Sequence, residues 1–405
     1  MKKGGRDRLK IAVIECSSCN QVDLTILHDF GLVPLAGYFP FAEQVDSTNL
    51  VEMRLLRCET CDLVQVDPIV DDEYLFSDYR YRSFFAMNKH FSQLSEWLVA
   101  KGFKNGEKIL EIGSNDGTLL QHLIGKGFNP IGVDPAANIV QYSKQLGHEV
   151  LIGHFSKSFV KENGLTGAFD LAISCNSFAH IQGIRGIASA VYMSLKSDGY
   201  FLIEVQSWEE LIRLRAFDFI YHEHKYYYNK TAMEYLLALE GFNLVSAEIV
   251  ESHGGSWRFL FRKSKEVPST KFGFSGTKSL KNDLAKVALA EFFSDLDSLQ
   301  KKIAEIKREG GKVIGFGASG RANMLLSYMS NPELITAVFD ESPERIGRTM
   351  GFTGIPIRSL ETLDQNEYTH CIVLAWNYFD SIREKWPHKG KILISPLPQL
   401  VTHET

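Results

Sequence analysis

The chain has 405 residues, with 44 Lys and Arg against 49 Asp and Glu and a formal net charge of -5. Its 44% hydrophobic and 23% charged residues are typical of folded globular proteins, and they exclude disordered, collagen-like and coiled-coil chains. The acidic balance argues against a protein dedicated to nucleic acid, which would carry a basic excess.

The chain begins with a basic segment that is followed by a short apolar run, Ile11 to Ile14. A secretory signal needs an apolar core of about 7–15 residues. No apolar run in the sequence approaches the ~18 residues that cross a bilayer. We therefore expect a cytoplasmic protein without a membrane partner, in a compartment that disfavours disulfides.

Four of the six cysteines form two pairs with CxxC spacing. Two such pairs can give four thiolates to a tetrahedral zinc ion. A redox CxxC usually stands alone near a βαβ pattern, and coincidence is the remaining alternative. Because four thiolates leave no open position for substrate, we predict a structural Zn²⁺ in a module of residues 1–80. Its predicted ligands are Cys16, Cys19, Cys58 and Cys61.

From about residue 86 the sequence alternates helical and strand patterns. Helices are expected at 88–101 and 118–125, and short strands at 108–112, 130–134, 169–174 and 199–204. This alternation predicts a parallel sheet with helices on both faces. An aromatic-rich segment at 252–262 predicts an antiparallel edge strand. We expect this central domain to cover residues 81–265.

A long amphipathic helix is predicted over residues 284–306, with Asn282 or Asp283 as its cap. A second α/β pattern follows, with strands expected at 312–316, 336–340, 370–375 and 391–394. We therefore expect a connecting segment of residues 266–310 and a C-terminal domain of residues 311–405. The predicted fold class is α/β, with a small zinc-binding N-terminal module, a central Rossmann-like domain and a second, smaller Rossmann-like domain.

A glycine-rich loop, EIGSNDG, runs from Glu111 to Gly117, between a predicted strand and a predicted helix. Its glycines allow a ligand to approach the backbone closely. Asp134, at the end of the next strand, can accept both hydroxyls of a ribose. The loop carboxylates would repel the phosphates of a dinucleotide, but they suit the cationic groups of S-adenosylmethionine (SAM). The loop thus favours SAM over a dinucleotide or a structural turn.

The eight positions that begin at Tyr221 contain two His, one Glu and four Tyr. A plain core would not collect so many titratable groups, because each buried one needs a partner. We favour an acid/base cluster; a second metal site at His222 and His224, or structural histidines, stay open. In an extended segment Tyr221 and Glu223 would face away from His224. His180 follows a predicted strand where ligands bind in parallel sheets, although a lone loop histidine is usually structural.

As a set, these motifs resemble the SAM-dependent sugar C-methyltransferases that methylate C3 of nucleotide-linked 4-keto-deoxyhexoses. The resemblance covers nearly the whole chain, in the right order. Its motifs are the CxxC pairs, EIGSNDG (111–117), AHI (179–181), YHEH (221–224), HGGSWR (253–258), GFGASGRANMLL (315–326), LAWNY (374–378) and PLPQ (396–399). One departure is the GxGxxG spacing from Gly315 to Gly320, where the family usually has a proline or lysine near Ser319 and Gly320.

The resemblance implies removal of the C3 proton, formation of an enolate and attack of that enolate on the methyl group of SAM. His224 is the leading candidate for the base, which suits the ordinary pKa of histidine. Glu223 is implied to orient His224 or to bind a sugar hydroxyl. Tyr221 and His180 are implied to hydrogen-bond the enolate oxygen.

The resemblance also implies binding residues. For SAM these are Glu111, Gly113, Ser114, Asn115, Gly117, Asp134, Pro135, Phe155 and Asn176. For the nucleotide sugar they are Tyr79, Tyr81, Ser83, His253, Arg258, Gly317, Ser319, Arg321, Asp340, Trp376 and Asn377. The loop before Arg321 would cradle the diphosphate. A core role for Phe155, and structural roles for His253 and Arg258, remain equally open.

The expected function is therefore that of an enzyme of deoxysugar biosynthesis, with a nucleotide-linked 4-keto-6-deoxyhexose as substrate. Two alternatives stay open: methyl transfer to O or N of a sugar or another small molecule, and an NAD(P)-dependent oxidoreductase that uses the loop at Gly315. A non-catalytic sugar-nucleotide-binding protein would have no reason for the Tyr–His–Glu cluster. We expect a monomer that does not bind nucleic acid.

Overall fold

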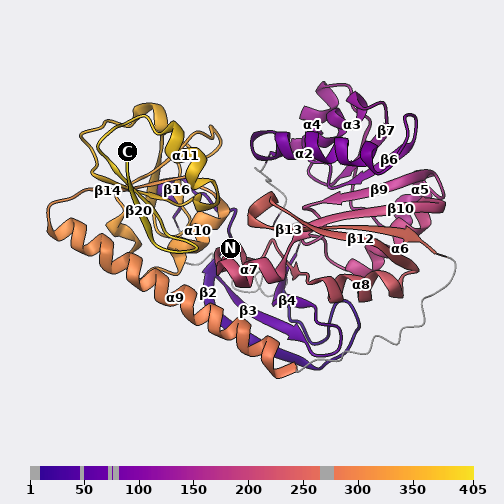
Figure 1. Cartoon of the computed structure of the whole chain (residues 1–405), viewed down its shortest axis with the longest axis horizontal. Helices are drawn as coiled ribbons and strands as arrows, with labels where there is room; N and C mark the ends of the chain where they lie inside the picture. Colours follow the sequence, from indigo (N-terminus) through magenta and orange to yellow (C-terminus); the bar gives the residue numbers. More distant parts are fainter. Residues whose placement is uncertain (1–9, 46–49, 72–74, 76–81, 265–277) are drawn as a thin grey trace.

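The computed structural model describes residues 10–45, 50–71, 75, 82–264 and 278–405. Figure 1 shows a C-terminal α/β lobe on the left, a central α/β lobe on the right and the N-terminal strands beneath them. A long helix, α9 (Lys278–Arg308), runs along the underside of the N-terminal strands and the C-terminal lobe. The predicted α/β fold class, with two Rossmann-like sheets and an N-terminal cysteine module, is confirmed.

The N-terminal module is built on a four-stranded antiparallel sheet in the order β11-β4-β3-β2. Its strands are β2 (Leu24–Pro34), β3 (Leu50–Cys58), β4 (Val64–Asp67) and β11 (Tyr226–Tyr227). A small second sheet pairs β1 (Lys10–Ile11) with β5 (Ile69–Val70). Since β11 comes from the segment that follows His224, this sheet joins the module to the candidate catalytic segment.

The central lobe holds a seven-stranded sheet in the order β12-β13-β10-β9-β6-β7-β8. The strands are β6 (Lys108–Ile112), β7 (Asn129–Asp134), β8 (Val150–Ile152), β9 (Phe169–Cys175), β10 (Leu195–Gln206), β12 (Phe242–Val250) and β13 (Ser256–Lys263). All pairings are parallel except those of β13, which lies antiparallel to β10 and β12. The predicted antiparallel strand is therefore present, but its placement at the edge was wrong. Its aromatic residues Phe259 and Phe261 are buried, and the more exposed β12 forms the edge.

Helices cover both faces of the central sheet because its inner strands are apolar on both sides. Ile109 packs with α2 (Ser83–Ala100) and α3 (Thr118–Gly125), whereas the next residue, Leu110, packs with α6 (Ile184–Ser194) and α8 (Lys230–Leu239). The other helices of this lobe are α4 (Ala137–Gln145), α5 (Lys157–Glu162) and α7 (Trp208–Leu214). Short 3-10 helices lie at η2 (Ala42–Gln44), η4 (Phe217–Phe219) and η5 (Ser252–Gly254).

The C-terminal lobe repeats this plan with the sheet order β16-β17-β15-β14-β18-β19-β20. Its strands are β14 (Val313–Phe316), β15 (Val338–Asp340), β16 (Thr349–Met350), β17 (Ile355–Ser359), β18 (His370–Val373), β19 (Ile392–Ser395) and β20 (Val401–Glu404). Its helices are α10 (Gly320–Ser327) and α11 (Phe379–Lys385), with the short turns η6 (Pro332–Leu334), η7 (Leu360–Thr362) and η8 (Trp376–Tyr378). The inner five strands are parallel.

Helix α9 ties the lobes together. Its apolar face, including Phe292 and Leu296, is buried in one core with Met53 of the module and Val313 of the C-terminal lobe. The helix begins at Lys278, so the predicted cap at Asn282 or Asp283 was wrong. Asn282 instead lies inside the helix, where it accepts from Arg57 (2.6 Å) and donates to Glu59 (2.9 Å) of the module.

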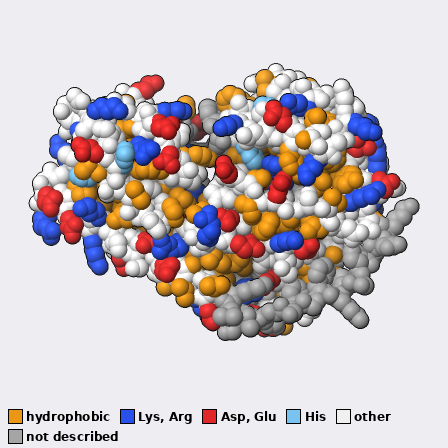
Figure 2. All heavy atoms as spheres, viewed as in Figure 1, with side chains coloured by type: hydrophobic (Ala, Val, Ile, Leu, Met, Phe, Trp, Pro, Cys, Tyr) orange, Lys and Arg blue, Asp and Glu red, His pale blue; other side chains and the backbone are white. Residues whose placement is uncertain are grey.

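The described residues contain no helix with the length and apolar character needed to cross a membrane. On the face shown in Figure 2, Lys and Arg side chains are interspersed with Asp and Glu. The described residues on that face therefore form no continuous basic band of the kind that binds nucleic acid.

Candidate active site and metal centre

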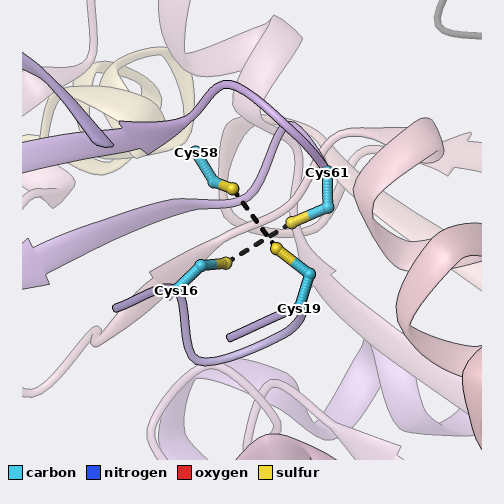
Figure 3. Close-up of side chains that lie close together, drawn as sticks. All are labelled: Cys16, Cys19, Cys58 and Cys61. Carbon is cyan, nitrogen blue, oxygen red and sulfur yellow. Dashed lines mark hydrogen bonds between the residues drawn. The ribbon is translucent and has the colours of Figure 1, made fainter. Parts of the chain in front are cut away.

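The four paired cysteines meet at one point. Figure 3 shows their sulfur atoms directed at a common centre, two from the loop before β2 and two from the turn after β3. The Cys16–Cys61 and Cys19–Cys58 sulfur pairs are each 3.4 Å apart, and all four sulfurs lie within 4.8 Å of one another. Four thiolates on a tetrahedral zinc ion would be about 3.8 Å apart, from a Zn–S distance of about 2.3 Å.

The electrostatics of this cluster are those of a site that a cation would stabilise. Hydrogen bonds with Cys16 and Cys61 lower the pKa of Cys58 to about 2. The hydrogen bond with Cys58, together with burial, raises the pKa of Cys16 to about 12. A second buried thiolate is therefore stable only beside a positive charge. The donor set fits zinc, and because all four ligands come from the protein, the site would be structural.

The module also fixes the segment that follows Tyr221. Tyr226 and Tyr227 pair with Gln65 and Val64 of β4. His222 Nε2 donates to the Glu52 carbonyl oxygen at 3.0 Å, and burial lowers the pKa of His222 to about 4. This neutral histidine is thus committed to the backbone. Among the described residues, His222 and His224 belong to no group of three potential metal ligands.

The EIGSNDG loop lies between β6 and α3, at the point where the strand order of the sheet reverses. Gly113 has a φ of +78°, and a Cβ there would lie 2.4 Å from Ser177 Cβ, so only glycine fits. Asp134 accepts the Asn115 N–H (2.9 Å) and the Ala136 N–H (2.8 Å), one on each oxygen. The loop is therefore held in an open curve at the site where ligands bind in such sheets.

A helix closes the other side of this loop. The N–H groups of Ser83 and Phe84, at the start of α2, donate to the side chains of Asn115 (3.0 Å) and Asp116 (3.1 Å). The loop side chains thus satisfy two of the free N–H groups at the helix start. Helix α2 is held against the loop and forms one wall of the pocket described next.

A pocket opens along the carboxyl ends of β6, β7 and β9. Of the residues predicted to bind SAM, its lining includes Gly113, Asn115, Asp134, Pro135, Phe155 and Asn176. Ser83, predicted to bind substrate, and His180 also line it. Two other residues predicted to bind SAM, Ser114 and Gly117, are not in the lining. Ser114 packs against Gly132 and Gly117 against Ser143, on the side of the loop away from the pocket. Sequence reasoning missed Met87, Phe91, His154 and Ile181 in the lining, because such residues read as ordinary core or loop positions.

The charges at and next to this pocket suit a cation: Asp134 lines the pocket, whereas Glu111, also predicted to bind SAM, lies in β6 and is not part of the lining. Burial, with the charges of Asp134 and Asp116, raises the pKa of Glu111 well above its usual value. One oxygen of Glu111 is buried without a hydrogen-bond partner among the described residues. Burial also raises the pKa of Asp134. A cationic ligand would stabilise these carboxylates, so the residues present fit SAM and would repel a phosphate.

Next to this pocket lies a group of three rings, in which His224 is stacked on Tyr221 and meets His180 edge-to-face. The His224 ring lies 4.1 Å from the Tyr221 ring and 4.5 Å from the His180 ring, between their centroids. Tyr221 Oη is 2.9 Å from His224 Nε2. Since η4 and a tight turn replace the extended segment considered from the sequence, Tyr221 and His224 lie together rather than on opposite faces. Because His180 also lines the pocket, this group adjoins the cofactor site.

The protonation of these histidines follows from their surroundings. The Phe219 carbonyl oxygen lies 3.2 Å from His224 Nδ1 and can only accept, so Nδ1 carries the proton and Nε2 the lone pair. Burial and the neighbouring His180 lower the pKa of His224 well below 6.5. Burial and the charge of Lys225 lower the pKa of His180 to about 3. Both rings are therefore neutral at physiological pH.

The Glu223 side chain is buried against the N-terminal module. One of its oxygens accepts the Gly37 N–H at 2.8 Å, and the other is buried without a hydrogen-bond partner among the described residues. Burial raises the pKa of Glu223. The carboxyl group can therefore accept a hydrogen bond from a ligand hydroxyl or, when protonated, donate one.

Arg258 is part of a buried ion pair, whereas His253 contacts an aromatic ring of η4. Arg258 donates to Glu204 at the end of β10, and Glu204 is also bonded to His90 (2.5 Å) and Cys175 (3.0 Å). His90, Cys175 and Glu204 lie close enough to suggest a second metal site, but the arginine already neutralises the carboxylate. His253 lies beside Phe219, and burial lowers its pKa to about 4.

In the C-terminal lobe, the GxGxxG loop makes internal contacts. Ser319 Oγ accepts the Ala322 N–H as the cap of α10, and Asp340 accepts the N–H groups of Ala318 (2.6 Å) and Ser342 (2.7 Å). A Cβ on Gly320 would lie 3.2 Å from Ala36 Cβ of the module. The start of α10 is thus packed against the N-terminal module.

Other predicted substrate residues meet at the lobe boundary. Arg321 lies over the Phe219 ring, beside Trp376 and Asn377, while Gly317 packs against Ala375. Tyr79 and Tyr81 fall outside the described residues. The structure therefore brings His180, Tyr221 and His224 together, with Arg321 and Trp376 reaching the same region from the C-terminal lobe, whereas the Glu223 side chain bonds to Gly37 of the N-terminal module. The roles of all these residues remain predictions.

Comparisons with known proteins find two matching family models and a curated relative. A model described as a methyltransferase domain matches residues 80–247, and one described as a C-methyltransferase C-terminal domain matches residues 251–398. The chain is 26% identical to C-methyltransferase NovU from Streptomyces niveus, across 96% of this chain and 97% of that protein.

Matches to solved structures are of low overall similarity, as two of them show. The magnesium protoporphyrin IX methyltransferase ChlM from Synechocystis PCC 6803, with bound SAM, is 15% identical, with a TM-score of 0.35 across 44% of this chain and 79% of that one. The PH0226 protein from Pyrococcus horikoshii OT3 is 18% identical, with a TM-score of 0.38 across 46% of this chain and 99% of that one.

The first model covers most of the central lobe, the second covers β13, α9 and most of the C-terminal lobe, and the likeness to NovU extends over nearly the whole chain. The carboxylate-lined pocket at the switch point of the central sheet agrees with this assignment. The resemblance inferred from the motifs is confirmed at this level: the chain carries a methyltransferase domain and a C-methyltransferase C-terminal domain, and it resembles a C-methyltransferase over nearly its whole length.

Proposed function

We propose that this enzyme methylates C3 of a nucleotide-linked 4-keto-6-deoxyhexose, and that His224 Nε2 removes the C3 proton. The observation that carries the proposal is the placement of His224, a half-buried neutral imidazole whose lone pair faces Tyr221 Oη and whose ring contacts His180, a residue that lines the cofactor pocket. NovU, by its name a C-methyltransferase, gives the precedent for carbon as the acceptor.

A carbon acceptor needs a base, because C3 becomes nucleophilic only after it loses its proton to form an enolate. Bound SAM supplies an electrophilic methyl group on a sulfonium. His224 would take the C3 proton on Nε2 while the electron pair of the C–H bond moves toward O4. Tyr221 Oη, which now shares its proton with Nε2, would turn to O4 and leave that lone pair for the substrate.

The remaining side chains would hold the sugar and the developing charge. His180 is neutral, so it can donate a hydrogen bond to the enolate oxygen without itself being a strong acid. The free oxygen of Glu223 can accept a sugar hydroxyl. The cysteine module would act at a distance, since its bound zinc would stiffen the sheet that ends in β11, directly after His224.

The test combines SAM with a panel of dTDP- and GDP-linked 4-keto-6-deoxyhexoses in deuterated water. We expect a mass gain of one CH₂ unit, and exchange of the C3 proton for deuterium when SAM is left out. His224→Asn should slow that exchange by at least about 10²-fold, the usual value of a general base, with SAM affinity unchanged. Methylation without C3 exchange would refute the enolate and favour an O- or N-acceptor. An NADH titration that shows binding would revive the oxidoreductase alternative.

A further inference from the structure

One arginine of the C-terminal lobe reaches the rings around the candidate base. The Arg321 guanidinium lies 3.6 Å from the centroid of the Phe219 ring and 4.7 Å from that of Trp376. Its side chain is only 12% exposed. Cation–π contacts of this kind are strongest when the cation is removed from water, so the arginine holds Phe219 firmly.

The residue before Phe219 completes the contact. Asp218 is fully buried, and one of its oxygens accepts the Trp376 Nε1–H (2.9 Å) and lies 2.9 Å from Arg321 Nη2. Arg321 Nη1 donates to Asn377 at 2.8 Å. A buried ion pair thus joins η4 of the central lobe to α10 and η8 of the C-terminal lobe. Loss of either partner would leave the other charge uncompensated.

Phe219 matters because of its carbonyl group. That oxygen accepts from His224 Nδ1 (3.2 Å) and from Tyr227 Oη (3.1 Å). The Phe219 and His224 rings are nearly parallel, with 12° between their planes. The position of Phe219 therefore determines which nitrogen of His224 carries the proton and how the ring is turned.

We propose that Asp218, Arg321 and Trp376 are positioning residues for His224, through which the C-terminal lobe clamps Phe219 and keeps the base in its Nδ1–H tautomer. This inference rests on the proposed function, because the tautomer matters when Nε2 is the base. It differs from a role of Arg321 in gripping the diphosphate. Positioning is favoured because both terminal nitrogens already contact the protein: Nη2 is in the ion pair with Asp218, and Nη1 donates to Asn377.

The test uses variants of the full-length enzyme. Arg321→Met keeps an apolar chain between the two rings, and the double variant Asp218→Asn/Arg321→Met also removes the orphaned charge, in case the single variant folds poorly. Arg348→Met is the matched control. Arg348 is an arginine of the C-terminal lobe. Like Arg321 it lies over a phenylalanine from another part of the chain, 4.2 Å from the centroid of the Phe41 ring in the N-terminal module.

The first readout is C3 deuterium exchange in the absence of SAM, with substrate affinity measured by calorimetry. Misplacing a catalytic group by about 1 Å can cost about 10²-fold, so we expect a loss of that order in Arg321→Met and in the double variant. Substrate affinity should be unchanged, as should exchange in Arg348→Met. Weakened substrate binding with exchange unimpaired at saturation would overturn the inference and make Arg321 a ligand of the diphosphate.

The second readout needs no substrate. Nitrogen-15 NMR of labelled histidine reports the tautomer of His224, whose signal is assigned with His224→Asn. We expect a single Nδ1–H form in the unmodified enzyme and a mixture in Arg321→Met. An unchanged tautomer would refute the clamp even if no sugar were found to exchange. Absence of exchange in the unmodified enzyme would count instead against the proposed function.

Discussion

Replacing Glu204 with Gln should destabilise the central lobe far more than the same change at Glu248, although both carboxylates pair with Arg258. Glu204 is fully buried and contacts His90, Cys175 and Arg258, which come from α2, β9 and β13. Glu248 lies 3.6 Å from Arg258 on the other side, with its side chain 43% exposed. The two variants therefore compare a buried and an exposed partner of one arginine.

The magnitude follows from the surroundings of Glu204. Burial alone would raise its pKa, but the hydrogen bond and charge of His90 and the charge of Arg258 lower it from 4.5 to about 2. At 1.36 kcal/mol per pH unit, the ionised form is favoured by about 3 kcal/mol. Because the pKa is lowered on folding, this stability is present above pH 4.5 and is lost as the pH falls toward 2. The exposed pair is worth less than about 1 kcal/mol.

Calorimetry of the two variants at neutral pH gives the test. At about 2–4 °C per kcal/mol, Glu204→Gln should lower the midpoint of the central transition by roughly 6–12 °C, and Glu248→Gln by a few degrees at most. Addition of SAM should raise the same transition and so identify it. Equal losses in the two variants would show that burial of Glu204 does not set the strength of this network, and the reasoning would fail.

Three further predictions concern the cofactor loop, the metal and the base. Gly113→Ala should weaken SAM binding by at least about tenfold in calorimetry, because it adds backbone strain of about 1–3 kcal/mol and an overlap with Ser177. Gly106→Ala, at a similar φ of +85° but in open space, should leave the affinity for SAM unchanged. Equal affinities of the two variants would contradict the placement of SAM against the loop. Cys58→Ser should abolish stoichiometric zinc in elemental analysis. It should also reduce turnover, because it loosens the sheet that ends at β11. A metal-free enzyme of full activity would show that the metal site does not support the candidate active site. Because burial lowers the pKa of His224 below 6.5, kcat should stay constant as the pH falls to 6.5, and an acid limb centred at or above 6.5 would argue against His224 as the base.

Local signals in the sequence predicted much of the secondary structure. The strand at 108–112 and the helix at 118–125 appear with the expected bounds, because an apolar run, a positive-φ glycine and a helical pattern act over neighbouring residues. The paired CxxC spacing likewise carried enough information to predict one cysteine cluster, since each pair forms a local turn.

Contacts distant in sequence were not predictable in this way. Asn282, expected as the cap of α9, instead lies inside the helix and bonds to Arg57 and Glu59 of the N-terminal module, contacts that the local sequence does not indicate. The lining of the SAM pocket by Met87 and Phe91 depends on how α2 docks on the loop, and a helical apolar pattern does not distinguish a pocket wall from a core.

The same division holds for the candidate base. Its residue type and its motif were readable from the YHEH sequence alone. The stacking of His224 on Tyr221, its tautomer and the clamp from Arg321 all required the tertiary structure. The physical reason is that side-chain chemistry is a local property, whereas protonation and orientation in a buried site are set by neighbours that the fold brings from three separate parts of the chain.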